Sequence, residues 1–326
     1  MTIVHALTGR RINGMKRFVC FVLFGLSAVC ASYAKCGSLE PTATVKFAQR
    51  DSCDLFFDYF APCRPGSDMP TVVFLFGGGF KGGHRSESRL EPWFRYLNDN
   101  GIGVVAIDYR LGMKGKKFAY NLRFVRNLKS AIDIAVEDLF SATDYLIRYG
   151  DSLGIDAGKL IVSGSSAGAM TSLQAEWEIC NGTQLSSVLP EGFNYKAVIA
   201  FAGAIFSDKG PVKYANKPCP QLLFHGTSDN IVPYKKISIF NYCFAGSCAI
   251  AGILDKCDAN YRLYSMKGNY HEIASNSYLF RETELDFIRR NVLAGEKVIV
   301  NATVSDPAIV VPDWARASTA ELINGD

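Results

Sequence analysis

Residues 159–170 read KLIVSGSSAGAM, and the rest of the chain is organised around this stretch. The apolar, β-branched run 160–162 predicts a short buried strand, and residues 167–179 have the pattern of a helix. Between them stands G-x-S-x-G with Ser166 at its centre. The two glycines leave room for a sharp turn that side chains would block. The pattern therefore predicts a serine hydroxyl presented at a strand tip, although a plain glycine turn has the same sequence.

A serine hydroxyl is a poor nucleophile and needs a base within hydrogen-bond reach, a task that suits histidine. Beyond residue 34 the chain has three histidines, namely His84, His225 and His271. We expect His271 to be the base, because it lies in the loop between the last predicted strand and the last predicted helix. His84, which follows a triple glycine, and His225, which ends a strand and is expected to hold a loop, are the alternatives.

The imidazole needs a carboxylate that orients it and stabilises its positive charge. Asp229 closely follows the predicted strand 221–224 and is the expected acid. The alternatives, each also explained as a solvated loop acid, are Asp208, Asp255 and Asp258. The resulting order along the chain is Ser166, Asp229, His271.

A tetrahedral intermediate needs hydrogen-bond donors for its oxygen. Three glycines follow the buried run 71–76, and the N–H groups of Gly78 and Gly79 could approach a substrate closely. The N–H group of Ala167, directly after the serine, would be a third donor. A flexible loop is the alternative explanation, but three glycines at a strand tip carry an entropic cost that such a use would explain.

Predicted strands and helices alternate after an opening hairpin. This order predicts an α/β fold, a doubly wound, mostly parallel sheet with an antiparallel N-terminal hairpin, and a site at the carboxyl ends of the strands. The predicted strands are 44–48, 54–60, 71–76, 103–108, 160–162, 196–202, 221–224 and 261–265, and the predicted helices are 88–100, 130–149, 167–179 and 275–292. The basic segment 114–129 is expected to be a solvated, loop-like rim.

The first 34 residues have the composition of a secretory signal, and Met15 is an alternative start. An uncleaved anchor is the other interpretation. Removing the four basic residues of this segment leaves 31 Lys and Arg against 31 Asp and Glu, a balance that argues against nucleic acid or an anionic membrane surface as partner. We expect a secreted or periplasmic protein with one catalytic domain, 35–295, and a C-terminal extension, 296–326, of unknown role.

An even number of cysteines in an exported chain predicts disulfides. The expected local pairs are Cys53 with Cys63 and one bridge within the group Cys243, Cys248 and Cys257. A zinc site is the alternative, but the chain has no Cys-x-x-Cys pair. The eight cysteines after residue 34 are Cys36, Cys53, Cys63, Cys180, Cys219, Cys243, Cys248 and Cys257.

Five motifs in this order resemble the α/β-hydrolase superfamily, and within it secreted carboxylesterases and hormone-sensitive-lipase-like esterases. They are FGGGF at 76–80, DYRLG at 108–112, GSSAG at 164–168, HGTSD at 225–229 and the loop histidine His271, and the resemblance runs from residue 47 to residue 292. It implies Ser166 as nucleophile, His271 as base, Asp229 as acid, and Gly78, Gly79 and Ala167 as the oxyanion hole, with no metal and no organic cofactor.

One departure concerns the residue before the glycines. Many such esterases carry a histidine there that stiffens the loop, whereas this chain has Phe76. The segment 108–112 is expected to be a structural support.

The expected activity is hydrolysis of carboxylic esters through an acyl-enzyme on Ser166. The expected substrates are small-molecule or polysaccharide esters with acetyl or feruloyl groups. This expectation rests on analogy with the family and on the predicted export of the protein. A peptidase of the same fold and a non-catalytic binding protein on this scaffold are the alternatives. We expect no nucleic-acid partner and no stable membrane insertion after signal cleavage, and the oligomeric state is left open.

Overall fold

The computed structural model describes the chain from residue 39 to residue 324, apart from positions 52, 65–67, 69 and 120. The described residues belong to one compact unit. The predicted signal segment and Cys36 lie outside the described residues, so the expectations about export stay predictions.

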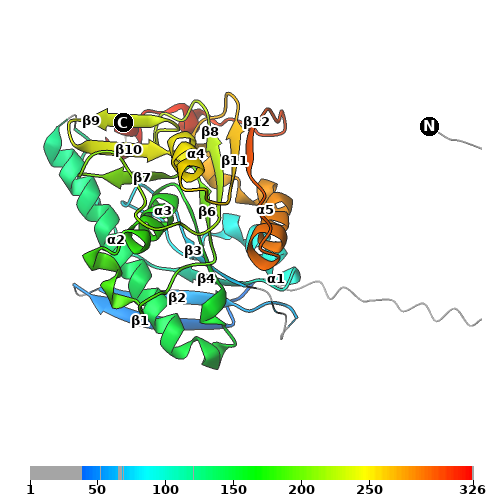
Figure 1. Cartoon of the computed structure of the whole chain (residues 1–326). Coiled ribbons are helices and arrows are strands. Elements are labelled where there is room, and N and C mark those ends of the chain that lie inside the picture. The colour runs from blue at the N-terminus through cyan, green and yellow to red at the C-terminus, as the bar shows by residue number, and fades with distance from the viewer. Residues whose placement is uncertain (1–38, 52, 65–67, 69, 120, 325–326) are drawn as a thin grey trace, which may run out of the picture. The chain divides into compact units, whose positions relative to one another are not determined.

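A nine-stranded sheet runs through the described part of the chain, in the spatial order β1-β2-β4-β3-β5-β6-β8-β11-β12 (Figure 1). The pairs β1–β2 and β2–β4 are antiparallel, and every other pair is parallel. The predicted α/β class is therefore confirmed. The strands are β1 Ala43–Arg50, β2 Cys53–Phe60, β3 Thr71–Leu75, β4 Gly103–Ile107, β5 Leu160–Ser165, β6 Ala197–Phe201, β8 Gln221–Gly226, β11 Tyr261–Met266 and β12 Val300–Val304.

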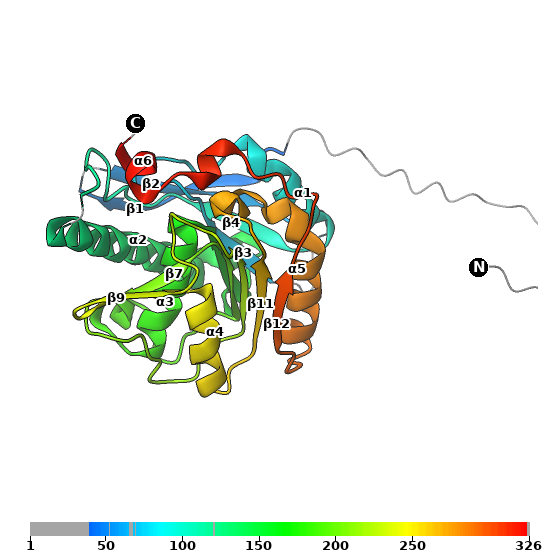
Figure 2. The same ribbon diagram turned by 90° about the horizontal axis from the view of Figure 1, so that it is seen from above.

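Helices cover both faces of this sheet, as a doubly wound fold requires (Figure 2). Helices α1 and α5 contact each other on one face, and α2 and α3 contact each other on the opposite face. The helices are α1 Glu91–Asp99, α2 Leu122–Tyr149, α3 Ala167–Cys180, α4 Ser247–Lys256 and α5 Arg281–Phe287.

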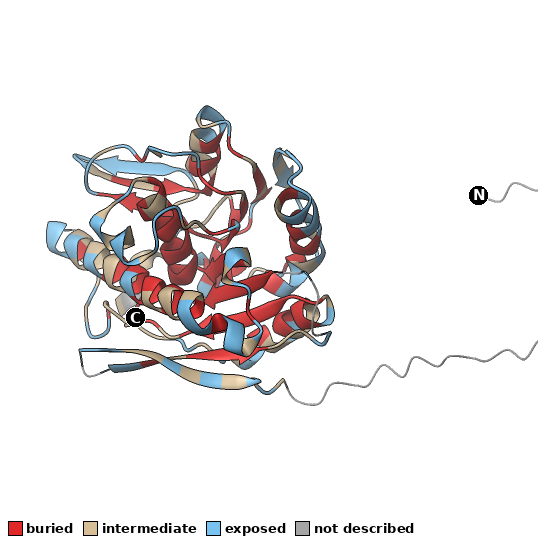
Figure 3. Ribbon diagram, turned by 60° about the horizontal axis from the view of Figure 1, so that its bottom comes forward, coloured by how far each residue is buried: buried red, intermediate tan, exposed pale blue. Residues whose placement is uncertain are grey.

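The centre of the sheet forms the core of the molecule (Figure 3). Every residue of β3, β4, β5, β6 and β8 is buried. Strands covered on both faces need apolar side chains on both, which explains why these segments are continuous apolar runs rather than alternating ones.

Helix α2 corrects the expectation that residues 114–129 form a loop. The helix begins at Leu122, eight residues before its predicted start, and the side chain of Asn121 accepts a hydrogen bond of 2.9 Å from the Phe124 amide. Asn121 is thus an N-cap, which satisfies one of the amides that a helix start leaves unpaired.

A second, three-stranded antiparallel sheet lies beside the first and was not predicted. It consists of β7 Ala204–Ser207, β10 Tyr242–Gly246 and β9 Lys236–Ile239, in that order. Phe240 follows β9 at the tip of the β9–β10 hairpin with φ 51°. Tight hairpins normally place Gly, Asn or Asp at such positions, so the usual sequence signal is missing here.

The C-terminal residues, expected to be an extension, take part in the same compact unit. Strand β12 pairs in parallel with β11 and forms an edge of the large sheet. After β12 the chain forms a 3₁₀ turn, Asp313–Arg316, and then the short helix α6, Thr319–Asn324. Two of its side chains, Ile309 and Ala315, are buried.

The expected local disulfides, Cys53 with Cys63 and a bridge within Cys243, Cys248 and Cys257, are absent from the described residues. Cys53 begins β2 and Cys63 lies beyond its end, so an extended strand of about 3.3 Å per residue holds them apart. Cys248 and Cys257 are separated by helix α4, whose rise of about 1.5 Å per residue likewise keeps their sulfur atoms too distant for a bond.

Candidate active site

Ser166 occupies the turn between β5 and α3 with φ 51° and ψ −116°. Few residues other than glycine adopt such a conformation, and it places the side chain at the strand tip. The flanking glycines make the turn fit. A Cβ atom on Gly164 would lie 2.3 Å from the carbonyl carbon of Gly168, and one on Gly168 would lie 2.1 Å from the Leu75 oxygen. Any larger residue at either position would push α3 away from the sheet.

A chain of hydrogen bonds connects Ser166, His271 and Asp229. Ser166 Oγ lies 2.8 Å from His271 Nε2, and His271 Nδ1 lies 2.7 Å from Asp229 Oδ2. A carboxylate can only accept, so Nδ1 carries the proton and Nε2 is free to accept the serine hydroxyl. The structure thus brings together three side chains that β5, β8 and β11 deliver to the same edge of the sheet.

The side chain of Asp229 is buried, and both oxygens of its carboxylate accept hydrogen bonds. Oδ1 accepts bonds of 2.8 and 2.9 Å from the amides of Ile231 and Val232, and Oδ2 accepts from both His271 and His225. Burial alone would raise the pKa of Asp229, but the electrostatic interaction with His271 and the hydrogen bonds from His225 and His271 hold it well below its usual range. The group therefore stays ionised beside the imidazole.

His225 supports the acid and does not contact the serine. It is fully buried, and its Nδ1 lies 2.8 Å from Ser247 Oγ. Its Nε2 lies 3.2 Å from both the Val232 carbonyl and Asp229 Oδ2. Because those two oxygens accept, Nε2 is the protonated nitrogen and Ser247 donates to Nδ1. Sequence reasoning expected His225 to hold its loop but gave no sign of Ser247, which lies 22 residues away along the chain.

The other histidine and the rival acids lie elsewhere. His84 is exposed, and so is Asp208 in the turn after β7. Asp255 accepts a hydrogen bond from the Tyr261 hydroxyl, and Asp258 pairs with Lys217 and Lys297. No contact joins any of these four to the triad within the described residues.

The loop before His271 is shaped by Glu272, a buried residue that sequence reasoning missed. Its carboxylate accepts hydrogen bonds from the Tyr270 amide at 3.0 Å and from Asn269 Nδ2 at 2.8 Å. Gly226 packs under the same loop, because a Cβ atom there would lie 2.2 Å from the Tyr270 oxygen. An acidic residue next to a candidate histidine was the available signal, but its partners become visible only in the folded loop.

The glycine loop lies directly against Ser166. A Cβ atom on Gly77 would be 3.3 Å from Ser166 Cβ, and Gly78 and Gly79 have φ values of 125° and 61° that favour glycine. The amides of Gly78 and Gly79 donate to no other residue in the part of the chain that the structure describes. The Ala167 amide opens α3, where Ser166 provides no side-chain cap. These three N–H groups are therefore available to an oxyanion.

Tyr109 supplies the support that a histidine before the glycines would give. Its hydroxyl donates a 2.7 Å hydrogen bond to the Phe76 carbonyl, and its ring stacks on Phe76 with centroids 4.4 Å apart. Its neighbours anchor the same segment, because Asp108 pairs with Arg85 and Arg110 pairs with the buried Asp138. The DYRLG segment thus fixes the glycine loop without a histidine.

The C-terminal segment lies against the loops that carry Asp229 and His271. The guanidinium of Arg316 stacks over the ring of Tyr270 at 5.0 Å from its centroid. The Thr319 hydroxyl donates to the carbonyls of Asn230 at 3.2 Å and Ile231 at 3.1 Å. The tail therefore touches both loops next to the triad.

Two further findings on the described residues concern metal binding and membrane crossing. Among the described residues, no group of three or more His, Cys, Asp or Glu side chains is arranged to hold a metal ion. No helix in the same part of the chain combines the length and the apolar composition needed to cross a bilayer.

Comparison with known proteins gives several matches to esterases and hydrolases. The family model BD-FAE matches residues 57–206, somewhat less than half of the chain. Esterase LipI of Mycobacterium tuberculosis is 29% identical over 115 residues, which cover 34% of this chain and 30% of that protein. The Rhodococcus erythropolis protein named "Probable N-octanoylanthranilate hydrolase AqdA2" is 30% identical over 111 residues, which cover 32% of this chain and 21% of that protein. The chain thus matches less than a third of the length of these curated relatives.

Solved structures extend the likeness over most of the fold. Esterase 2 of Thermogutta terrifontis, with propionate bound, superposes with a TM-score of 0.58 at 20% identity, covering 78% of this chain and 95% of that one. The mostly parallel sheet of this chain agrees with that superposition. The chain therefore has the α/β-hydrolase fold of these esterases, and its residues 57–206 match the BD-FAE family model.

Proposed function

We propose that this protein is a serine esterase that hydrolyses carboxylic esters through an acyl-enzyme on Ser166. The observation that carries the proposal is the hydrogen-bond chain from Ser166 through His271 to Asp229, with the imidazole in the tautomer that accepts the serine proton. The unbonded glycine amides beside the serine add the donors that ester chemistry needs.

The reaction would proceed in two halves. Ser166 Oγ attacks the ester carbonyl while His271 Nε2 takes its proton, and the amides of Gly78, Gly79 and Ala167 bind the resulting oxyanion. The oxyanion collapses, the alcohol leaves with the proton from Nε2, and the acyl group stays on Ser166. A water molecule then gives a proton to Nε2 and attacks the acyl carbonyl. As this second oxyanion collapses, the bond to Ser166 Oγ breaks, Nε2 returns the proton to Oγ, and the acid is released. Asp229 stabilises the imidazolium in both halves.

The proposed substrates are short-acyl or carbohydrate-linked esters outside the cytoplasm. Relatives named esterase and hydrolase support ester cleavage, and esterase 2 of Thermogutta terrifontis has been solved with propionate and with butyrate, both short acids. The signal-like N-terminal composition supports export. Ester-bearing plant polysaccharides fit both features.

The decisive experiment combines turnover with covalent trapping. Wild-type protein should hydrolyse p-nitrophenyl acetate and should gain one phosphonyl group on Ser166 from a fluorophosphonate, as mass spectrometry would show. Ser166→Ala should lose both, with kcat falling by at least about 10³-fold and the melting temperature unchanged. Ser165→Ala is the matched control, because that neighbouring hydroxyl is buried with no hydrogen-bond partner among the described residues and should be dispensable for turnover.

Other outcomes would redirect the assignment. Faster cleavage of aminoacyl-anilides than of esters would indicate a peptidase. Folded wild-type protein that neither turns over esters nor accepts the phosphonate would indicate a binding protein on this scaffold. Acetylated xylans, feruloylated sugars and simple esters, compared by kcat/KM, would then rank the substrate classes.

A further inference from the structure

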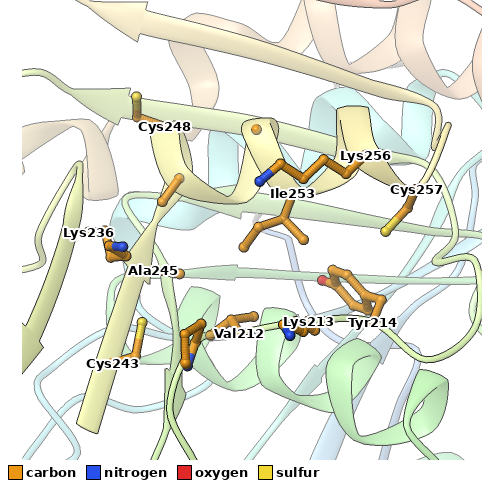
Figure 4. Close-up of a pocket in the computed structure, with 13 residues that line it drawn as sticks. Val212, Lys213, Tyr214, Lys236, Cys243, Ala245, Cys248, Ile253, Lys256 and Cys257 are labelled. Carbon is orange, nitrogen blue, oxygen red and sulfur yellow. The ribbon is translucent and has the colours of Figure 1, made fainter. Parts of the chain in front are cut away.

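A cavity lies apart from the triad, between helix α4, the β9–β10 hairpin and the segment 211–214 (Figure 4). Its volume is about 630 Å³, within the range of sites that hold small organic ligands. None of Ser166, His271 and Asp229 lines it.

The charge of this cavity is of one sign. Three lysines line it, Lys213, Lys236 and Lys256, and no Asp or Glu does. The other lining side chains that can ionise are cysteine thiols and the Tyr214 hydroxyl. None of the three lysines forms an ion pair within the described part of the chain. The side chain of Lys256 runs back along α4 toward Ile253 (Figure 4). Three ammonium groups around one hollow create a positive potential that attracts an anion.

The walls of the cavity are apolar. Val212, Ala245 and Ile253 line it, together with the ring of Tyr214. The Tyr214 hydroxyl accepts a 3.1 Å hydrogen bond from Gln221 Nε2, which anchors the ring. A small inorganic ion would leave this apolar surface uncovered, whereas a ligand with a hydrocarbon or aromatic body would bury it.

The register of the β9–β10 hairpin builds this combination. Lys236 pairs directly with Ala245, and both line the cavity, as does Cys243 on the same face. Their neighbours Ile237 and Phe244 line a separate groove on the other face of the hairpin. The alternation of strand side chains therefore directs Lys236 toward the cavity.

We propose that this cavity binds an organic carboxylate with an apolar body, either an aromatic acid or a medium-chain aliphatic acid. The lysines would hold the carboxylate as point charges, without the fixed geometry that an arginine fork demands. The apolar walls would hold the body. Binding requires no triad residue, so it is independent of the proposed reaction at Ser166.

Thiols of the protein provide the readout. Cys248 and Cys257 line the cavity and are partly exposed, whereas Cys53 is exposed far from it on β2. The full-length protein would be treated with iodoacetamide. Peptide mass spectrometry would then measure the rate at which each cysteine is alkylated. Octanoate or 4-hydroxycinnamate at about 1 mM should slow alkylation of Cys248 and Cys257 at least about fivefold and leave Cys53 unaffected.

Charge variants separate this site from a general effect. The triple variant Lys213→Glu, Lys236→Glu and Lys256→Glu should lose the protection. Lys196→Glu, which reverses an exposed lysine outside the cavity, should keep it. Calorimetric titration of the same two acids into wild-type and triple-variant protein gives a second measurement that does not depend on thiol reactivity, and heat should be seen only with wild type.

Four results would overturn the proposal. The first is no protection and no heat with either acid at about 10 mM. The second is protection of Cys53 equal to that of Cys248 and Cys257. The third and fourth are protection by inorganic phosphate, or by octanol, equal to that by the two acids. Phosphate alone would show that the apolar walls have no role, and octanol alone would show the same of the lysines.

Discussion

At the scale of single residues, Ser166 combines a strained backbone with a set of contacts that hold it in place. A non-glycine residue at φ 51° costs about 1–3 kcal/mol. The Ser166 amide donates to the Phe201 carbonyl at 2.9 Å, and its own carbonyl accepts from the Met170 amide at 2.9 Å. Strand β6 and helix α3 therefore keep the hydroxyl aimed at His271.

Asp229→Asn tests the orientation of the imidazole. The asparagine amide would fit the site but would favour the wrong histidine tautomer, so kcat should fall by about 10⁴-fold. Steady-state hydrolysis of p-nitrophenyl acetate measures the effect, and circular dichroism checks that the fold is kept. A rate near that of wild type would transfer the role of the acid to another residue.

His225→Leu tests the support behind the acid. The change removes a donor to Asp229 and leaves the Ser247 hydroxyl and the Val232 carbonyl unpaired in the core. Loss of a hydrogen bond to a charged group should cost about 1.5–3 kcal/mol of unfolding free energy. Urea denaturation measures that loss, and kcat should fall while KM stays the same. His225→Gln, which keeps an N–H donor, should recover part of both, and equal behaviour of the two variants would exclude a positioning role.

At the scale of elements, the approach of α3 to β3 sets the position of Ser166. Gly168→Ala would place a methyl group 2.1 Å from the Leu75 oxygen, so α3 must move away from the sheet. We expect a loss of about 3 kcal/mol in unfolding free energy and a large loss of kcat. Gly252→Ala on α4 is the control, since a Cβ atom there meets open space and should be neutral or stabilise by up to about 1 kcal/mol. Equal stability of the two variants in urea would contradict the predicted clash.

The elements predicted correctly are those whose pattern is local. Buried runs such as 71–76 and 196–202 gave β3 and β6 because parallel strands covered on both faces must be apolar throughout. Strand β9 was not predicted, since all four of its residues are exposed and only pairing with β10 makes it a strand. The start of α2 was placed too late because its basic residues hid the cap at Asn121.

At the scale of the whole molecule, the C-terminal segment links the edge of the sheet to the triad loops. A chain that ends at residue 305 would lose the buried Ile309 and the contacts of Arg316 and Thr319 with those loops. Burial of the isoleucine alone contributes about 1.5–3 kcal/mol, so the melting temperature should fall. Hydrogen exchange should rise at residues 229–232 and 269–272 and stay unchanged in β5.

Val310→Ala serves as the matched control for that truncation. Val310 is 78% exposed, next to the buried Ile309, so its truncation should alter neither stability nor exchange. If the shortened chain kept the exchange rates of the full chain at both loops, the tail would have no part in holding the triad.

The sequence by itself determined the features that short motifs encode: the sharp turn at Ser166, the glycines beside it, and the order of strands and helices that places Asp229 and His271 at one edge of a sheet. Local sterics and hydrophobic pattern suffice for these features. Only the tertiary structure decided that Ser247 and His225 hold Asp229 and that Tyr109 supports the glycine loop. It also decided that the C-terminal segment contacts the triad loops and that three lysines line a cavity. Each of these depends on distances between residues far apart in the chain, and such distances exist only once the core has packed.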